Sequence, residues 1–259
     1  MEHPVAEPPE GAPTFVFTDI ESSSALWEAV PGAMARALRA HDALIFRACS
    51  ARKGYVVKAE GDAFMIAFST VEDAINFALL TQQALARLSW PQLLEQEQEE
   101  RGVQGPLGLR VRIGIHQGDA ERRPNPVTGR SDYFGQTVNI AARLCDMAHG
   151  AQVLISGVTL KQCTPPHATV VTLLGPTPIR GMKKTIRVYQ TVSAAWWPIE
   201  FPALRLGRIQ THDGVGQPTG RRDLNTEMEA VADQLFARAQ LDRFAGRFEA
   251  AVHELRALQ

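Results

Sequence analysis

The sequence contains few cysteines and lacks the cysteine patterns of disulfide-rich or zinc-binding proteins. Its 259 residues include three cysteines, Cys49, Cys145 and Cys163, which lie far apart and form no C-x-x-C pair. An odd number of isolated cysteines argues against a disulfide framework and against a cysteine-based zinc site. We therefore expect a protein of a reducing compartment, the cytoplasm.

An excess of charge of one sign and long apolar runs are missing as well. The formal net charge is −1, so no basic field points to nucleic acid or to an anionic membrane. No stretch approaches the roughly 20 apolar residues that span a bilayer, so no membrane span is predicted. Residues 1–13 are rich in proline and glutamate and lack the apolar core of a signal peptide, so we expect a disordered arm there.

The order of predicted elements indicates a mixed fold. Short β-rich runs predict strands at residues 14–20, 55–59, 63–68, 109–116, 152–156, 170–174 and 186–192. The remaining patterns predict helices at residues 27–53, with a break at Pro31-Gly32, and at 70–88, 136–148 and 157–162. This order predicts an α+β fold: a ferredoxin-like βαββαβ sandwich with additional C-terminal strands and a helix.

The chain divides into a main domain, residues 14–193, and a C-terminal appendage. Residues 194–226 have little periodicity and resemble a linker. Residues 227–259 predict a helical hairpin about as long as one tetratricopeptide repeat. Because a single repeat cannot bury its own face, this hairpin should dock on the main domain, a second copy or a protein partner. Within the main domain, residues 91–107 predict a surface insertion with one short helix, and residues 117–131 an exposed loop or arm.

Two carboxylates stand at strand ends. Asp19 ends the first predicted strand and precedes a serine-capped helix, whose free N–H groups suit anionic oxygens. Asp62 lies at the turn of the hairpin formed by residues 55–68, which also carries Lys58. Taken alone, Asp19 could simply cap the helix and Asp62 could simply stabilise a turn. If the two met, they would suit a pair of Mg²⁺ ions acting on a phosphate.

A helix at residues 136–148 carries two further candidates. Asn139 and Arg143 are spaced i, i+4 and therefore project from one face. An arginine can stabilise the charge that develops on a transferred phosphate, and an asparagine can orient a ribose. Lys58 and Asp132 form a candidate charge pair in otherwise apolar or loop surroundings. Histidines offer no comparable pattern, because none of them has H-x-x-x-H or H-x-x-E-H spacing.

Four segments, in order, carry a family resemblance: FTDIESSSALWE, GYVVKAEGDAFMIAF, LRVRIGIHQG and DYFGQTVNIAARL. Together they resemble the catalytic domain of class III nucleotidyl cyclases, over about residues 13–192. They are most similar to adenylyl cyclases of the branch found in fungi and trypanosomatids and their bacterial relatives. The resemblance implies conversion of ATP to 3′,5′-cyclic AMP and pyrophosphate with two Mg²⁺ ions per site, for which Mn²⁺ can substitute.

The resemblance also implies a role for each candidate. Asp19, Asp62 and the Ile20 carbonyl would hold the metals. Lys58 and Asp132 occupy the base-selecting positions, where a Lys/Asp pair implies adenine and GTP-using relatives typically carry Glu and Cys. Asn139 would position the ribose and Arg143 would stabilise the pentavalent α-phosphate. For the phosphate-binding lysine, Lys183 and Lys184 are both candidates, because Gly181-Met182 departs from the usual Gly-Lys.

In this family two chains pair head to tail, and each site lies at their interface. Since one chain carries both sets of residues, the resemblance implies a homodimer with two equivalent sites. The proton of the 3′-hydroxyl could go to Asp19 or to solvent. Three other readings stay open: the same chemistry on another base, a non-catalytic dimerising module that binds nucleotide and signals through its C-terminal helices, and a scaffold built on the helical tail.

Overall fold

The computed structural model describes residues 6–103, 105–126, 128–180, 182, 184–196 and 199–206. Several sequence predictions fall at least partly outside these residues. They include residues 1–5 of the predicted N-terminal arm, Lys183, the greater part of the linker at residues 194–226, and the helical hairpin at residues 227–259. Among the described helices, none is both long enough and apolar enough to cross a membrane.

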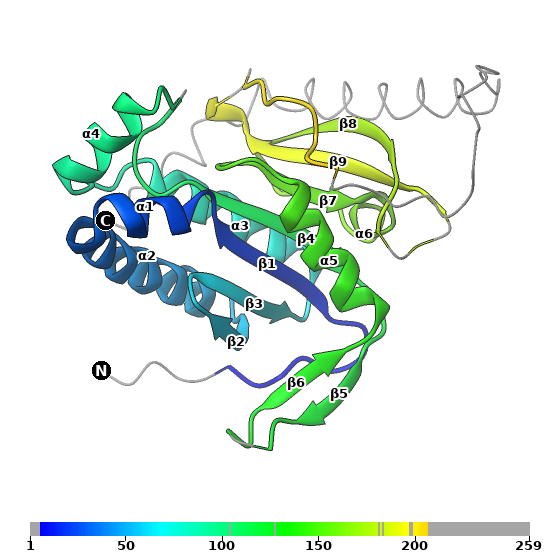
Figure 1. Cartoon of the computed structure of the whole chain (residues 1–259). Coiled ribbons are helices and arrows are strands. Elements are labelled where there is room, and N and C mark those ends of the chain that lie inside the picture. The colour runs from blue at the N-terminus through cyan, green and yellow to red at the C-terminus, as the bar shows by residue number, and fades with distance from the viewer. Residues whose placement is uncertain are drawn as a thin grey trace, which may run out of the picture.

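A seven-stranded sheet forms the centre of the structure (Figure 1). In spatial order its strands are β2 (Tyr55–Glu60), β3 (Ala63–Phe68), β1 (Thr14–Ile20), β4 (Val111–Gln117), β7 (Val153–Ser156), β9 (Ile186–Ser193) and β8 (Thr169–Thr177). Neighbours are antiparallel except β4 and β7, which are parallel. From β1 to β4 the chain follows the predicted βαββαβ order, and the later elements follow the predicted order of helix, strand, helix and two strands.

Helices cover both faces of this sheet. They are α1 (Ser23–Ala29), α2 (Pro31–Ala51), α3 (Val71–Leu85), α4 (Gln92–Glu100), α5 (Gln136–Met147) and α6 (Gly157–Leu160), followed by the short 3-10 helix η1 (Ala194–Trp196). The α2 and α3 helices enclose the largest apolar cluster, to which Ile66, Ile113 and Ile155 contribute from the sheet. The α5 helix packs on the opposite face, mainly against β4 and β1 (Figure 1). Pro31 starts α2, so the predicted break between the first two helices is confirmed.

Gly114 on β4 allows α5 to lie directly on the sheet. A Cβ atom at this position would come within 2.2 Å of the Cys145 backbone nitrogen and 2.5 Å of the Ala141 carbonyl oxygen. Since real Cβ atoms do not approach backbone atoms so closely, any larger residue would push the helix away. Close backbone packing therefore fixes α5, which carries Asn139 and Arg143, relative to the end of β1.

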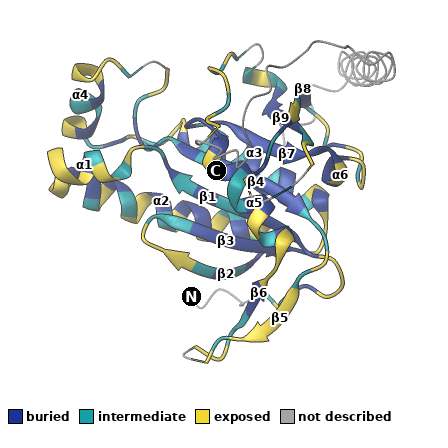
Figure 2. Cartoon of the chain, turned by 45° about the vertical axis from the view of Figure 1, so that its right-hand side comes forward, coloured by how far each residue is buried: buried dark blue, intermediate teal, exposed yellow. Residues whose placement is uncertain are grey.

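The predicted exposed arm contains a small sheet that the sequence did not reveal. Strands β5 (Glu121–Pro124) and β6 (Ser131–Phe134) pair antiparallel and project from the main sheet (Figure 1). All four residues of β5 are exposed, as the yellow colouring in Figure 2 shows. An exposed strand does not need apolar residues at alternate positions, so the sequence carried no strand period here.

Part of the N-terminal arm has defined contacts, contrary to the prediction of disorder over residues 1–13. Pro9 is buried, and its carbonyl oxygen accepts a hydrogen bond of 3.1 Å from the Tyr133 hydroxyl. The Gly118 N–H donates to the Pro13 carbonyl oxygen at 3.3 Å. Residues 6–13 are therefore held against β6 and the end of β4. Their proline-rich backbone has few N–H groups, and its carbonyl oxygens accept hydrogen bonds from these neighbours.

Candidate active site

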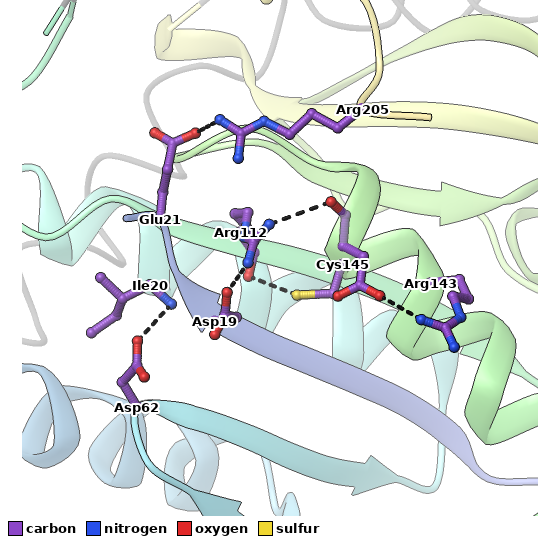
Figure 3. Close-up of polar contacts among 9 residues, drawn as sticks. Asp19, Ile20, Glu21, Asp62, Arg112, Arg143, Cys145 and Arg205 are labelled. Carbon is purple, nitrogen blue, oxygen red and sulfur yellow. Dashed lines mark hydrogen bonds and ion pairs between the residues drawn. The ribbon is translucent and has the colours of Figure 1, made fainter. Parts of the chain in front are cut away.

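The candidate metal ligands lie where β1 separates from β3, a region that we call the metal end. Their pairing ends at Thr18 and Phe64, so Ile20 extends past the ladder beside the β2–β3 turn. Asp62 lies in that turn, and its Oδ2 accepts a hydrogen bond of 3.3 Å from the Ile20 N–H. The turn thus brings Asp62 back to the end of β1, where Asp19 also lies (Figure 3).

The Ile20 carbonyl group points toward the same place. The Glu21 N–H donates to the Arg110 carbonyl oxygen at 2.9 Å and therefore points toward β4. In a planar trans peptide the carbonyl oxygen points opposite to the N–H, so the Ile20 oxygen is directed away from β4, toward the side of Asp62. Two carboxylates and one backbone carbonyl therefore gather at one end of β1.

This donor set fits Mg²⁺, which takes oxygen ligands and is commonly held by one or two carboxylates plus phosphate oxygens of the substrate. Within the described residues, no group of three or more His, Cys, Asp or Glu side chains could by itself hold a metal ion. Asp19, Asp62 and Ile20 would thus provide only part of the coordination sphere, and a bound nucleotide would have to supply oxygens as well.

Arg112 contacts the Asp19 carboxylate, a partner that sequence reasoning missed. The two residues face each other across β1 and β4, and the guanidinium forms an ion pair with Asp19 Oδ2 (Figure 3). Burial alone would lower the pKa of Arg112, but the hydrogen bond and the charge of Asp19 raise it overall. The sequence held one signal for this partner. Apolar residues alternate over residues 109–116, which places Arg110 and Arg112 on the strand face opposite the buried isoleucines.

The base-reading candidates meet on the other side of the hairpin. Lys58 Nζ lies 3.2 Å from Asp132 Oδ2, so β2 and β6 place a donor and an acceptor side by side. The Asp132 side chain is about nine-tenths buried, at 10% exposure, whereas Lys58 is more accessible at 36%. The second carboxylate oxygen of Asp132 accepts the Tyr133 N–H at 2.8 Å, which fixes the orientation of the carboxylate.

Three contacts hold the β5–β6 arm against β2. The Tyr55 hydroxyl donates to the Ser131 carbonyl oxygen at 3.1 Å. Arg130 donates to the Val56 carbonyl oxygen at 2.7 Å, and its guanidinium lies 4.8 Å from the centre of the Tyr55 ring. Because Asp132 follows these anchors directly, they set its distance from Lys58.

The structure does not bring the α5 candidates to the metal end of the same chain. Asn139 is exposed, and Arg143 pairs with Asp146 at 3.0 Å, one turn along the helix. Figure 3 shows Arg143 on α5, apart from Asp19 and Asp62. In one chain the candidates thus fall into two groups, which we call half-sites: Asp19, Asp62 and the Ile20 carbonyl at the end of β1, and Lys58, Asp132, Asn139 and Arg143 elsewhere.

Two smaller expectations have different outcomes. Lys184 is exposed, while Lys183 lies outside the described residues, so the choice between them as a phosphate-binding residue stays a prediction. Ser22 occupies the N-cap position of α1, but it has a left-handed φ of 59° and its side chain makes no capping hydrogen bond. The prediction that a serine side chain caps this helix is therefore wrong, since α1 starts directly after a tight turn.

A family model described as the adenylate and guanylate cyclase catalytic domain matches residues 5–193. The chain belongs to this family. The match ends at the last residue of β9, so the cyclase domain comprises the whole seven-stranded sheet and the helices that cover it. The resemblance inferred from the four sequence segments is confirmed.

The chain is similar to trypanosomal and fungal proteins. It is 34% identical over 271 residues to the receptor-type adenylate cyclase GRESAG 4.3 of Trypanosoma brucei brucei, in an alignment that covers 94% of this chain and 22% of the relative. It is 41% identical over 161 residues to an adenylate cyclase of Mycosarcoma maydis, which covers 60% of this chain and 6% of the relative. The chain thus spans about a fifth or less of the length of these two relatives.

Solved structures share the cyclase fold. A structure of adenylate cyclases from Trypanosoma brucei in their monomeric state superposes with a TM-score of 0.66 at 35% identity, covering 78% of this chain and 99% of that chain. The adenylyl cyclase CyaB from P. aeruginosa shares the fold alone, with a TM-score of 0.55 at 20% identity, over 70% of this chain and 94% of that chain.

Proposed function

We propose that this cyclase domain converts ATP to 3′,5′-cyclic AMP and pyrophosphate. The observation that carries the choice of ATP is the Lys58–Asp132 pair at 3.2 Å. A lysine can donate to the ring nitrogen N1 of adenine, and a carboxylate can accept from the exocyclic amine. Guanine reverses both requirements, because its N1 carries a proton and its C6 carries an oxygen, so the same pair disfavours GTP.

In the proposed reaction, the ribose 3′-oxygen bonds to the α-phosphorus, and the bond from that phosphorus to the oxygen of the leaving pyrophosphate breaks. The hydroxyl proton passes to solvent or to the Asp19 carboxylate. Asp19, Asp62 and the Ile20 carbonyl would hold two divalent metal ions, Mg²⁺ or Mn²⁺. When bound, these ions would stabilise the charge on the attacking and leaving oxygens.

The second half-site would orient the nucleotide. Asn139 is proposed to hold the ribose and Arg143 to stabilise the charge on the pentavalent α-phosphate, since charge-assisted hydrogen bonds aimed at a developing charge lower the barrier. Arg143 is suited to this role because its partner Asp146 is 58% exposed, so the ion pair is in water and exchanges at little cost.

We further propose that two copies pair head to tail and complete each other's sites. The support is the separation of the half-sites: in one chain Asp62 contacts β1, whereas Lys58, four residues earlier, contacts the arm. A symmetric dimer would place the metal end of one copy opposite the base-reading surface of the other, twice. Because a monomer would hold no complete site, specific activity should rise with protein concentration.

A cytoplasmic location remains part of the proposal. Its support is the state of the cysteines: Cys49, Cys145 and Cys163 are all free thiols. Burial raises the pKa of the Cys49 thiol to about 12, so this cysteine stays in the unreactive thiol form.

A turnover assay tests the proposed function. The purified chain is incubated with ATP or GTP and with Mg²⁺ or Mn²⁺, and the cyclic nucleotides are quantified. We expect cyclic AMP from ATP and far less cyclic GMP from GTP. If neither nucleotide is cyclised with either metal, the proposal is wrong, and equal rates with the two nucleotides would reject the assignment of adenine.

A further inference from the structure

Glu21, the residue directly after the metal end of β1, is held between two arginines. Its side chain is only 10% exposed. One oxygen lies 3.4 Å from the Arg110 guanidinium, and the other forms an ion pair with Arg205 (Figure 3). Both oxygens of this enclosed carboxylate therefore have a cationic partner.

Gly150, in the loop after α5, closes this cluster. A Cβ atom there would lie 2.6 Å from the Glu21 Oε2 atom and 2.5 Å from the Arg110 Cβ atom. Only a residue without a side chain fits, so the loop lies directly on the Glu21–Arg110 pair. Glu21 is thus confined by Arg110, which directly precedes β4, by the loop after α5 and by Arg205.

Arg205 belongs to a segment that follows the cyclase domain. We call residues 199–206 the strap; they come after residue 193, where the family match ends. The Arg205 N–H donates to the Met147 carbonyl oxygen at 3.1 Å, and the His149 Nε2 atom lies 2.9 Å from the Ala203 carbonyl oxygen. The strap is therefore anchored to the end of α5, and Arg205 reaches from it to Glu21.

The position of Glu21 determines where the Ile20 carbonyl points. The Ile20 carbonyl and the Glu21 N–H belong to one planar peptide group. The Glu21 N–H donates a hydrogen bond to the Arg110 carbonyl oxygen. A shift of Glu21 would rotate that plane and turn the Ile20 oxygen away from the side of Asp62. Partners that orient a ligand in this way, without touching the metal, typically change metal affinity by about 10- to 100-fold.

We propose that Glu21 and Arg205 are positioning residues for the metal site, and that the strap holds the Ile20 carbonyl in its ligating orientation. The proposal rests on the proposed function, because it requires the Ile20 carbonyl to be a metal ligand. It connects the strap, which follows the cyclase domain in the sequence, to the proposed metal site. Release of the strap would weaken metal binding without removing either carboxylate.

Direct measurement of metal binding tests the proposal. Mn²⁺ is titrated by electron paramagnetic resonance into the full chain in the presence of 3′-deoxy-ATP, which has no attacking hydroxyl and cannot be cyclised. We expect Arg205→Ala and Glu21→Gln each to raise the Mn²⁺ dissociation constant by about tenfold. The double variant should be no weaker than Glu21→Gln alone, because both changes break the same contact.

Two further variants separate positioning from general damage. Arg101→Ala removes a guanidinium of matched exposure, 44% against 42% for Arg205, from an ion pair with Glu97 on α4. It should leave the Mn²⁺ affinity unchanged. Arg205→Lys keeps the charge and should restore most of the affinity, and urea unfolding should show similar midpoints for the wild-type chain and the Arg205 variants.

The outcomes distinguish this inference from the proposed function. Unchanged Mn²⁺ affinity in both Arg205→Ala and Glu21→Gln, alongside loss of binding in Asp62→Ala, would overturn the inference and leave the proposed function standing. The inference would also be overturned if the variants lost Mn²⁺ affinity in proportion to a lower urea midpoint and Arg101→Ala lost affinity in the same way. A wild-type chain that binds no Mn²⁺ with the analogue would overturn both proposals.

Discussion

Lys58 on β2 and Asp132 on β6 form an ion pair at 3.2 Å although 74 residues separate them in the sequence. The pair connects the central sheet to the β5–β6 arm, whose strand β5 is exposed. Its two partners differ in burial, with Asp132 enclosed and Lys58 accessible, so a ligand could reach the lysine and one edge of the carboxylate. This arrangement suits the recognition of a flat group with one acceptor and one donor.

Replacement of both residues of this pair should change the preferred nucleotide. In the double variant Lys58→Glu with Asp132→Cys, the donor facing N1 becomes an acceptor, and the acceptor facing the exocyclic group becomes a weak donor. We expect the ratio of kcat/KM for ATP to that for GTP to fall by at least about 100-fold, since each mismatched polar contact costs about 1–3 kcal/mol. An unchanged ratio in an active variant would reject the assignment of Lys58 and Asp132 to the base.

Loss of the arm's anchor should affect nucleotide binding more than chemistry. Arg130 bonds to the Val56 carbonyl oxygen at 2.7 Å and stacks on Tyr55, which keeps the Asp132 carboxylate near Lys58. In Arg130→Ala we expect KM for ATP to rise by about tenfold, the order of one or two lost contacts, and the preference for ATP over GTP to fall. Arg123→Ala removes an exposed arginine of the same arm, paired with Glu121, and should change neither quantity.

Removal of a proposed metal carboxylate should strongly reduce turnover. Asp62→Ala takes away one of the two carboxylates at the end of β1 and the partner of the Ile20 N–H. Loss of several kcal/mol of metal-assisted stabilisation corresponds to a fall in kcat of about 10³-fold. Glu99→Gln, which changes an exposed carboxylate on α4, serves as the control and should retain full activity. Retained turnover in a folded Asp62→Ala variant would exclude Asp62 as a metal ligand.

His116 should make folding stability depend on pH. Its Nδ1 atom lies 2.6 Å from the Ser156 hydroxyl oxygen in the core, and burial lowers its pKa from 6.5 to about 4. Between these values the unfolded chain binds a proton that the folded chain does not. The stabilisation is therefore complete above about pH 6.5 and decreases as the pH falls toward 4, by up to about 3 kcal/mol.

Urea unfolding of the wild-type chain and of His116→Gln, at pH 7.5 and at pH 5, would measure this effect. The unfolding free energy of the wild-type chain should fall by about 2 kcal/mol more than that of the variant, because the unfolded histidine titrates over about 1.5 pH units of this range. Equal decreases in the two proteins would show that His116 does not titrate differently on folding.

The central fold was predictable because its strands and helices are buried and therefore periodic. Residues 63–68 and 109–116 alternate or are wholly apolar, and both form strands of the sheet. The β5–β6 arm was not predictable as a small sheet, since its strand Glu121–Pro124 is exposed and carries two arginines and a proline. Its Asp132 could nevertheless be assigned to the site through the resemblance of the surrounding segment.

The candidate site was predictable only in part. The turn at Asp62 and the strand end at Asp19 could be located from local sequence, because both depend on short-range patterns. The Asp19–Arg112 and Glu21–Arg205 pairs could not, since they depend on strand register and on a contact 184 residues apart. Charged partners separated in this way leave no periodic signal, and only the folded structure reveals them.

Mixing two inactive variants tests the central claim, that each site combines residues of two copies. Lys58→Ala damages only the base-reading half, and Asp62→Ala damages only the metal half. Random exchange of subunits would make half of the dimers hybrid, each with one intact site out of two. We therefore expect recovery of about one quarter of the wild-type activity.

A mixture of Lys58→Ala with Asp132→Ala provides the matched control, since both changes damage the same half and no hybrid holds an intact site. It should stay inactive. Mixing Lys58→Ala with Asp62→Ala at concentrations where hybrid dimers are verified by mass measurement, and assaying cyclic AMP from ATP, therefore decides the matter. Recovery of cyclic AMP formation in the Lys58→Ala and Asp62→Ala mixture, but not in the control, would support sites shared between two copies. No recovery despite verified hybrid dimers would contradict shared sites.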